Sequence, residues 1–294
     1  MGAAVTLARP QARLTTRPWG RWREPSVLPG FWPALGFTVT YLSLIVLIPL
    51  AALIARPWEH GVGDAWRTVT DPRVLASLRL SFGAAFLASL VNVVMGLITA
   101  WALVRYEFPG RRLLDAAVDL PFALPTAVAG ISLATIYAPH GWIGALFAPL
   151  GIKIAYTPAG VFVALVAVGL PFIVRSVQPV LQDLDAEVEE AAQTLGARPF
   201  QRARLVILPA VLPSLVTGFS LAFARAVGEY GSVIFIAGNM PMKSEIAPLL
   251  IIIKLSQFNY AGAAAVGLAM LVLSFAALLG INAIQLVLAR RSGK

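Results

Sequence analysis

Two charged residues interrupt a long apolar stretch in the last third of the chain. Arg225 and Glu229 are the only charged residues between Leu205 and Met242. Because they are four positions apart, an α-helix places both side chains on one face, within reach of an ion pair. Arginine also presents fixed N–H donors that match the oxygens of an anion. The pair therefore predicts either a structural ion pair or part of a pathway for an anion.

Other chemistry is poorly represented in the sequence. The chain contains no cysteine, which excludes disulfides, thiolate metal sites and cysteine nucleophiles. Its two histidines, His60 and His140, lie far apart in polar connections and form no ligand pair. Neither a Gly-x4-Gly-Lys-Ser/Thr phosphate loop nor a cluster of nucleophile, base and metal ligands is present. We therefore expect no catalytic residue, no metal and no cofactor on this chain.

The composition predicts that Arg225 and Glu229 are positioned by membrane helices. Of 294 residues, 59% are hydrophobic and 13% charged, against about 45–50% and about 25% in soluble domains. A run of about 20 apolar residues crosses the hydrocarbon core as a helix. The sequence predicts an all-α polytopic protein with six spans, near residues 34–56, 77–105, 113–138, 157–178, 206–236 and 259–289.

The positive charges indicate how these spans are oriented. The net charge is +9, from 23 Lys and Arg against 14 Asp and Glu. With the N-terminus inside, fifteen of the cations fall in cytoplasmic segments, seven fall on the opposite side, and Arg225 lies within a span. Cytoplasmic segments carry surplus Lys and Arg, so the distribution predicts that both termini are cytoplasmic. The basic balance thus reports topology, and nucleic acid is not an expected partner.

Three further features of the sequence concern how the spans pack, where they kink and how two of them are connected. Ser77, Ser81, Ala85 and Ser89 place small residues on one face of the second span, which favours close helix packing. Pro121, Pro125 and Pro171 can kink their helices. Residues 139–156 are rich in glycine, proline and aromatic residues and predict a short re-entrant or interfacial helix.

A short amphipathic helix is predicted between the fourth and fifth spans. Apolar residues recur there at three- and four-residue spacing, namely Leu181, Leu184, Val188, Ala191 and Leu195. Carboxylates crowd its N-terminal part, where the helix dipole favours negative charge. Gly196 provides a C-terminal stop and Pro199 can open the next helix. The apolar stripe needs a surface to pack against, either a partner protein or the ends of the chain's own helices.

The spacing in this segment resembles the EAA loop of binding-protein-dependent ABC importer permeases. Glu190, Ala191 and Ala192 are followed by Leu195 and Gly196, and then by Val206, Leu208 and Pro209 at the intervals of that motif. Val206 replaces the usual isoleucine. The resemblance covers about residues 75–285 and implies a six-helix type I importer transmembrane domain. It also implies that Glu190, Ala191, Ala192, Leu195, Gly196 and Pro209 couple the chain to an ATPase subunit.

The stretch around the charged pair is similar to the sulfate and molybdate branch of these permeases. Residues 224–231 read Ala-Arg-Ala-Val-Gly-Glu-Tyr-Gly, and residues 240–254 and 257–262 are similar to T-type subunits of sulfate/thiosulfate permeases. The resemblance implies a W-type permease partner, two sulfate ATPase subunits that bind ATP and Mg, and a periplasmic sulfate/thiosulfate-binding protein. Arg225, Glu229 and Tyr230 then become candidates for the substrate pathway.

The resemblance thus implies a pore-forming sulfate/thiosulfate permease subunit in a bacterial inner membrane, surrounded by lipid. A molybdate or tungstate permease is the alternative within the class, and a secondary anion transporter is the alternative outside it. The expected organisation is a cytoplasmic basic tail at 1–33, a first membrane helix at 34–56, a type 1 core at 75–285 and a cytoplasmic tail at 286–294.

Overall fold

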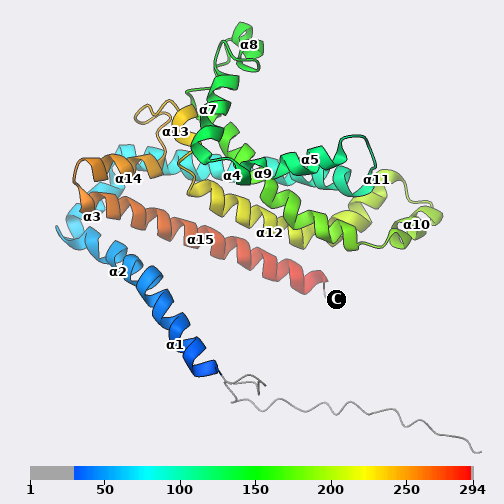
Figure 1. Ribbon diagram of the computed structural model, residues 1–294, viewed down its shortest axis with the longest axis horizontal. Coiled ribbons are helices and arrows are strands. Elements are labelled where there is room, and N and C mark those ends of the chain that lie inside the picture. Colours follow the sequence, from blue (N-terminus) through cyan, green and yellow to red (C-terminus); the bar gives the residue numbers. More distant parts are fainter. Residues whose placement is uncertain (1–29, 293–294) are drawn as a thin grey trace, which may run out of the picture. The chain divides into compact units, whose positions relative to one another are not determined.

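The computed structural model describes residues 30–292, apart from the side chains of residues 186 and 286–292 (Figure 1). Every regular element within residues 30–292 is helical, so the all-α class is confirmed. The chain divides into two units, Met1–Pro49 and Leu50–Lys294. The predicted basic tail, 1–33, lies outside the described residues except for its last four positions.

The first predicted span forms a helix from Phe31 to Trp58. It comprises α1 (Phe31–Leu42), the π-helical turn η1 (Ser43–Leu47), α2 (Ile48–Ala55) and the 3₁₀ turn η2 (Arg56–Trp58). Its first charged residue is Arg56, and no residue of 30–49 is buried. The segment is long and apolar enough to cross a bilayer.

Three helices form the packed centre of the second unit: α4 (Pro72–Arg105), α9 (Pro158–Asp183) and α12 (Leu208–Val227). Local sequence determines where two of them begin. Asp71 accepts a hydrogen bond from the Arg73 N–H at 2.8 Å, and Thr157 accepts one from the Ala159 N–H at 3.2 Å. Each cap is followed by a proline at the first helical position. The predicted spans 77–105 and 157–178 are confirmed, although α4 starts earlier and α9 ends later.

Glycines allow α4 and α9 to approach closely. A β carbon on Gly96 would overlap Ile173, and one on Gly169 would overlap Asn92. Asn92 is fully buried and donates from Nδ2 to the Val166 carbonyl oxygen at 3.0 Å. The predicted small face of α4 is confirmed as a packing face, because Ser77, Ser81, Ala85 and Ser89 are all buried.

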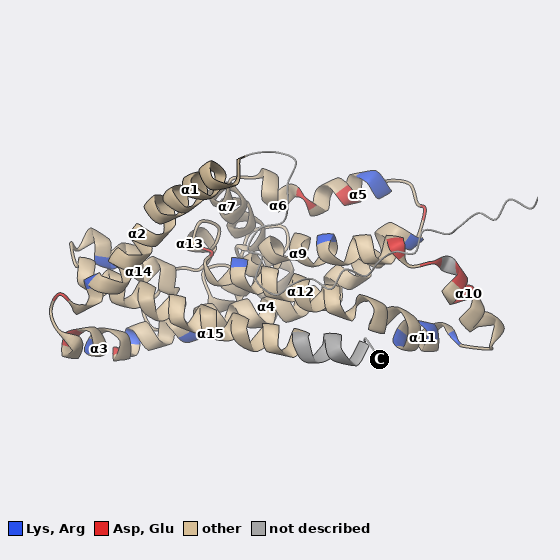
Figure 2. Cartoon of the chain, turned by 90° about the horizontal axis from the view of Figure 1, so that it is seen from below, with Lys and Arg blue, Asp and Glu red and all other residues tan. Residues whose placement is uncertain are grey.

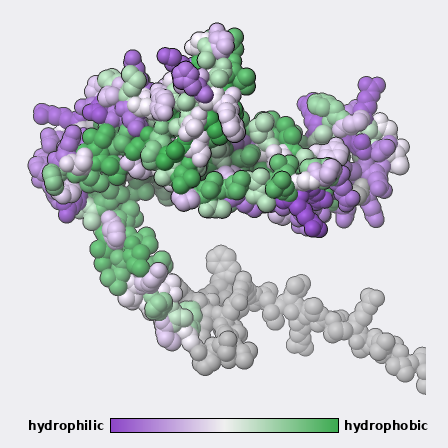
Figure 3. All heavy atoms as spheres, turned by 45° about the horizontal axis from the view of Figure 1, so that its top comes forward, coloured by the Kyte–Doolittle hydropathy of each residue, from purple (hydrophilic) through white to green (hydrophobic). Residues whose placement is uncertain are grey.

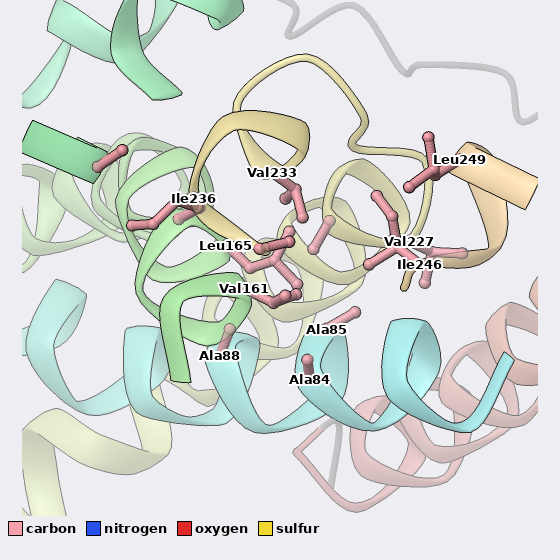
Figure 4. Packing of buried hydrophobic residues seen from close by; sticks show 14 of the residues in the cluster. Ala84, Ala85, Ala88, Val161, Leu165, Val227, Val233, Ile236, Ile246 and Leu249 are labelled. Carbon is pink, nitrogen blue, oxygen red and sulfur yellow. The ribbon is translucent and has the colours of Figure 1, made fainter. Parts of the chain in front are cut away.

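One apolar cluster joins α4 and α9 to two short helices, α13 (Val233–Ile236) and α14 (Ala247–Ser256) (Figure 4). Figure 4 shows Ala84, Ala85 and Ala88 of α4 facing Val161 and Leu165 of α9, with Val233 and Ile236 belonging to α13. Ala85, Ala88, Val161, Val233 and Ile236 are completely buried. In water, burying a methylene group stabilises a protein by about 0.8 kcal/mol, but helices that pack against each other in lipid gain no such hydrophobic free energy. Close van der Waals contact therefore stabilises this cluster.

The third predicted span, 113–138, is wrong as a single helix. It is divided into α5 (Arg111–Val118), α6 (Leu120–Ala123) and α7 (Thr126–Tyr137). Leu124 and Pro125 are extended, with ψ of 137° and 132°. Proline disfavours the helical conformation at the residue before it and lacks the N–H that would continue the ladder, so Pro125 interrupts the segment.

The fifth predicted span, 206–236, is wrong at both ends. The helix starts earlier, with α11 (Pro199–Arg202) and the π-helical turn η4 (Ala203–Ile207), and then continues as α12 to Val227. Gly228 follows, and α13 begins only at Val233. Glycine has low helix propensity, so Gly228 favours the end of α12. The side chain of the next residue, Glu229, then accepts a hydrogen bond from the Ser232 N–H in the turn before α13.

Among residues 30–292, five helices are long and apolar enough to cross a membrane, one fewer than the six predicted: Phe31–Trp58, Pro72–Arg105, Pro158–Asp183, Pro199–Val227 and Tyr260–Gln285. The last belongs to α15 (Tyr260–Ser292), which confirms the predicted span 259–289. The backbone of α15 continues into the predicted C-terminal tail, 286–294. The shorter apolar helices α7 and α14 supplement these spans.

Short helices occupy the connections. They are α3 (Val62–Thr70), α8 (Gly144–Phe147) with the 3₁₀ turn η3 (Ala148–Leu150), and α10 (Ala186–Thr194). Figure 2 shows charged residues on α3, α5, α10 and α11, whereas the long helices are mostly uncharged. In Figure 3, hydrophobic surface covers the middle of the second unit and hydrophilic residues gather towards its ends. This separation is typical of a helical unit that is surrounded by lipid at its middle.

Candidate coupling loop and charged membrane sites

The loop predicted to be amphipathic contains the expected helix, turn and second helix. α10 ends at Thr194, and Gly196 adopts a left-handed conformation with φ of 83°. The Gly196 N–H donates to the Gln193 carbonyl at 2.9 Å, and the Ala197 N–H donates to the Ala192 carbonyl at 3.0 Å. These two bonds form a Schellman motif, which requires a residue that tolerates positive φ. Gly196 therefore determines the sharp turn between α10 and α11.

Most of the predicted coupling residues are exposed. Leu195 is 88% exposed, Glu190, Ala191, Gly196 and Pro209 are also exposed, and Ala192 is partly buried. Phe200, just after the turn, is 74% exposed. At the other end of the stripe, Leu181 is completely buried. The apolar stripe thus begins in the core of the chain and ends on an open surface formed by α10 and α11.

Two polar contacts hold α10. Arg105, the last residue of α4, donates from Nη2 to Glu189 Oε1 at 2.5 Å and to the Leu184 carbonyl at 3.2 Å. Its guanidinium also lies over the Trp101 ring, 5.7 Å from the centroid. Arg202 donates from Nη1 to Gln193 Oε1 at 3.0 Å. The carboxylate that pairs within the chain is therefore Glu189, whereas the neighbouring Glu190 is exposed.

Arg225 and Glu229 form the predicted ion pair, at 2.5 Å between Nη1 and Oε2. They do not share one continuous helix, because Arg225 lies in the last turn of α12 and Glu229 follows its end. The Glu229 side chain is 2% exposed, and its Oε1 accepts from the Ser232 N–H at 2.9 Å and from the Ser232 hydroxyl at 2.8 Å. The Arg225 side chain is 38% exposed. Tyr230 packs against the apolar cluster.

The break after α12 lies against the break before α7. A β carbon on Gly231 would overlap the Thr126 side chain, and one on Gly130 would overlap the Ser232 backbone. Both interruptions identified above therefore meet close to Glu229. Irregular backbone at membrane depth is tolerated only where protein covers it or where it lines a water-filled cavity. The Arg225–Glu229 pair thus lies beside a junction of two discontinuous helices.

Two further ion-pair clusters connect distant segments. Arg73 donates to both carboxylate oxygens of Glu245, from Nε at 2.8 Å and from Nη2 at 2.7 Å. Arg175 of α9 donates to both oxygens of Asp119, at 2.9 and 2.5 Å, and to Asp115 Oδ1 at 2.7 Å. The second cluster joins α9 to the discontinuous segment α5–α6. Bidentate arginine–carboxylate pairs of this kind restrict orientation as well as supplying attraction.

The sequence interpretation missed Arg105, Glu189, Arg73, Glu245 and Arg175 as interacting residues. The two members of each ion pair are 56 to 172 positions apart in the sequence. A single sequence contains no signal for such pairs beyond a charge at the end of an apolar run. Within residues 30–292, no group of three His, Asp or Glu side chains is placed to hold a metal ion.

Comparison with known proteins supplies the context for these sites. A family model described as the binding-protein-dependent transport system inner membrane component matches residues 92–293. The sulfate transport system permease protein CysT of Salmonella typhimurium is 47% identical over 265 residues, which is 90% of this chain and 96% of that protein. The CysT protein of Synechocystis is 49% identical over 259 residues, 87% of this chain and 91% of that protein.

Solved structures with low sequence identity share the fold. A bacterial ABC transporter involved in the import of the acidic polysaccharide alginate gives a TM-score of 0.72 at 15% identity, covering 87% of this chain and 94% of that chain. The MetNI methionine ABC transporter gives 0.56 at 19% identity, covering 73% and 95%. The helical arrangement described above is therefore that of importer membrane subunits.

Proposed function

This chain belongs to the family of binding-protein-dependent transport system inner membrane components, and from that premise we propose that it is the sulfate/thiosulfate permease subunit of an ATP-driven importer. It is a multi-pass membrane subunit and not an enzyme. The observation that carries the cargo assignment is the 47% identity, over 90% of the chain, to a protein named for sulfate transport. The relatives reported above are named for sulfate, which favours it over molybdate or tungstate.

The proposed assembly contains a W-type permease partner, two ATPase subunits that bind ATP and Mg, and a periplasmic sulfate/thiosulfate-binding protein. Lys and Arg are more numerous on the side of the loop 181–209 than on the opposite side, fifteen against seven. This distribution supports a cytoplasmic location for the loop and for both termini. The ATPase subunits then lie beneath α10, and the binding protein docks on the opposite surface.

The proposed coupling helix is α10. Its exposed surface at Glu190, Leu195 and Phe200 supports this role, because a helix packed on its own bundle would bury Leu195. An apolar side chain that is 88% exposed at a charged, hydrophilic end of the unit favours contact with another protein over contact with lipid. The partner proposed for this surface is the ATPase.

The proposed pathway cation is Arg225, with Glu229 holding it and Tyr230 beside it. Glu229 uses one oxygen for Arg225 and the other for Ser232, so the arginine is positioned by a buried and fully bonded carboxylate. Over a third of the Arg225 side chain remains exposed, which supports contact with a passing anion. A charged side chain in a membrane helix usually faces a cavity or a partner.

Reconstitution tests the proposal. The complete complex in liposomes, with binding protein outside and ATP inside, should accumulate labelled sulfate and thiosulfate and should prefer them to molybdate. Uptake that persists without the ATPase would support the secondary transporter instead. Preferential uptake of molybdate would support the alternative importer.

A further inference from the structure

The longest helix of the second unit, α4, carries an ion pair at each end. At its start Arg73 makes the bidentate pair with Glu245, whose side chain is 1% exposed. At its end Arg105 pairs with Glu189 of α10. A rise of 1.5 Å per residue places these two arginines about 50 Å apart, more than the hydrocarbon thickness of a bilayer. One helix therefore contacts α10 at one membrane surface and the loop 238–246 at the other.

The ion pair at the α10 end of α4, Arg105–Glu189, is restrained on several sides. The Arg105 and Glu189 side chains are 21% and 18% exposed, so water reaches them only in part. Trp101 packs on the guanidinium, and the Leu184 carbonyl accepts a second N–H. Among the described side chains, this ion pair is the one that joins α10 to a long membrane helix. A displacement of α10 must therefore either break this pair or move the end of α4.

The outer loop is fastened to the first three turns of α4. Besides Arg73 and Glu245, the Ala247 N–H donates to the buried Ser81 hydroxyl at 2.9 Å. Within the loop, the Met240 N–H donates to the Ser244 hydroxyl at 3.0 Å. The loop 238–246 is thus linked to the start of α4 by the charged pair, and the residue that follows the loop, Ala247, by a neutral hydrogen bond.

The middle of α4 packs closely against α9. Neither Gly96, which faces Ile173, nor Gly169, which faces Asn92, has room for a β carbon. Close-packed interiors have low compressibility and transmit displacement. A shift imposed at one end of α4 is therefore carried along the helix pair as a rigid-body movement.

We propose that Arg105 and Arg73 are positioning residues that make α4 a rigid link between α10 and the loop 238–246. The inference rests on the proposed function, because it takes α10 as the surface that the ATPase moves. Linkage is reciprocal, so a protein that binds the outer loop must change the free energy of the state adopted by α10. Through α4, the outer surface thus controls ATP hydrolysis, and ATP hydrolysis controls the outer surface.

The test measures sulfate uptake and ATP hydrolysis together in liposomes containing the full complex. For Arg105→Ala, the ATPase should still copurify, but sulfate transported per ATP should fall about tenfold, within the usual range of coupling effects. The exchange variant, Arg105→Glu with Glu189→Arg, should recover most of the ratio. Three results would overturn the proposal. The first is an unchanged ratio of sulfate to ATP in Arg105→Ala, and the second is loss of the ATPase from that variant. The third is an exchange variant whose ratio is as low as that of Arg105→Ala.

The Arg73 end of α4 is tested by a separate measurement, the stimulation of ATP hydrolysis by loaded binding protein. Arg73→Lys retains a positive charge but loses the bidentate contact, so hydrolysis without binding protein should be unchanged while stimulation by loaded binding protein falls. Unchanged stimulation would contradict a link through this end. Arg56→Ala removes an arginine from an exposed pair with Glu59, at 52% and 49% exposure, and serves as the matched control. If the unmodified complex shows no ATP-dependent uptake, the proposed function fails first, independently of these variants.

Discussion

The surface of α10 and the junction after α12 are opposite kinds of charged site. On α10, Glu190 and Leu195 are exposed, and two side-chain contacts restrain the whole helix. At the junction, Glu229 is buried and accepts hydrogen bonds from Ser232 while it pairs with Arg225. The motif residues Glu190 and Leu195 thus face outwards at the first site, whereas the carboxylate of the second site is buried and bonded within the chain. Substitutions should therefore affect association at α10 and stability at the junction.

Removal of the buried carboxylate should have the largest effect on stability. Glu229→Ala leaves Arg225 without its partner and the Ser232 N–H without an acceptor. Breaking a buried pair costs about 3–5 kcal/mol, and we expect about 3 kcal/mol because Arg225 is partly exposed. Thermal unfolding of the purified protein in detergent should show a lower midpoint and a smaller yield of inserted protein.

Glu229→Gln is the matched variant, since its amide oxygen can still accept from Ser232. It should retain more stability than Glu229→Ala while losing the charge attraction to Arg225. Glu59→Gln, at an exposed pair, should change the free energy of unfolding by less than about 1 kcal/mol. Equal effects of Glu229→Ala and Glu59→Gln would contradict the contrast between the two sites.

The contact between the two helix breaks should also be intolerant of added volume. Gly130→Ala places a methyl group against the Ser232 backbone and should destabilise the protein by about 1–3 kcal/mol. Gly83, within α4, has open space around the same position. Gly83→Ala should therefore be neutral or stabilise by up to about 1 kcal/mol through better helix propensity. Thermal midpoints of the two variants measure the difference, and equal shifts would refute the close contact.

Arg225→Ala should separate transport from assembly. Glu229 keeps its bonds to Ser232, but its buried charge loses its partner, so stability should also fall. Transport must therefore be compared per assembled complex. Sulfate uptake should fall about tenfold, equivalent to about 1.4 kcal/mol of lost interaction. Arg225→Lys, with charge but fewer donors, should be intermediate. Collapse of assembly, with transport per assembled complex unchanged, would make Arg225 a structural residue only.

The α10 loop could be predicted from the sequence more completely than the Arg225–Glu229 site. The positions of α10, Gly196 and Pro199 follow from local spacing and turn chemistry, and the structure contains each of them. The Arg225–Glu229 pair was predicted from four-residue spacing, and it forms across a helix end that the spacing did not reveal. Glu189 could not be distinguished from Glu190, because its partner Arg105 is 84 positions away.

The fold was predictable where hydropathy alone determines a helix. Uninterrupted apolar runs gave the spans that became α4, α9 and α15. The segments 113–138 and 206–236 are also largely apolar, yet Pro125 and Gly228 interrupt them. Whether such a residue kinks or ends a membrane helix depends on which neighbouring element satisfies the released backbone groups. Here α7 and the turn before α13 pack against each other, which is a tertiary contact that the sequence does not display.

The smallest effect on stability should come from the exposed side of α10. Glu190→Lys should change the free energy of unfolding by less than about 0.5 kcal/mol, because the side chain is exposed and forms no ion pair or hydrogen bond with the residues that the structure describes. Copurification of the ATPase should nevertheless fall, since the substitution reverses a charge on the proposed contact surface. Glu187→Lys makes the same change in the first turn of α10, outside the motif, and should retain the ATPase. If both variants lose it equally, general acidity of the helix and not the motif position determines coupling, whereas selective loss in Glu190→Lys separates association from stability at this surface.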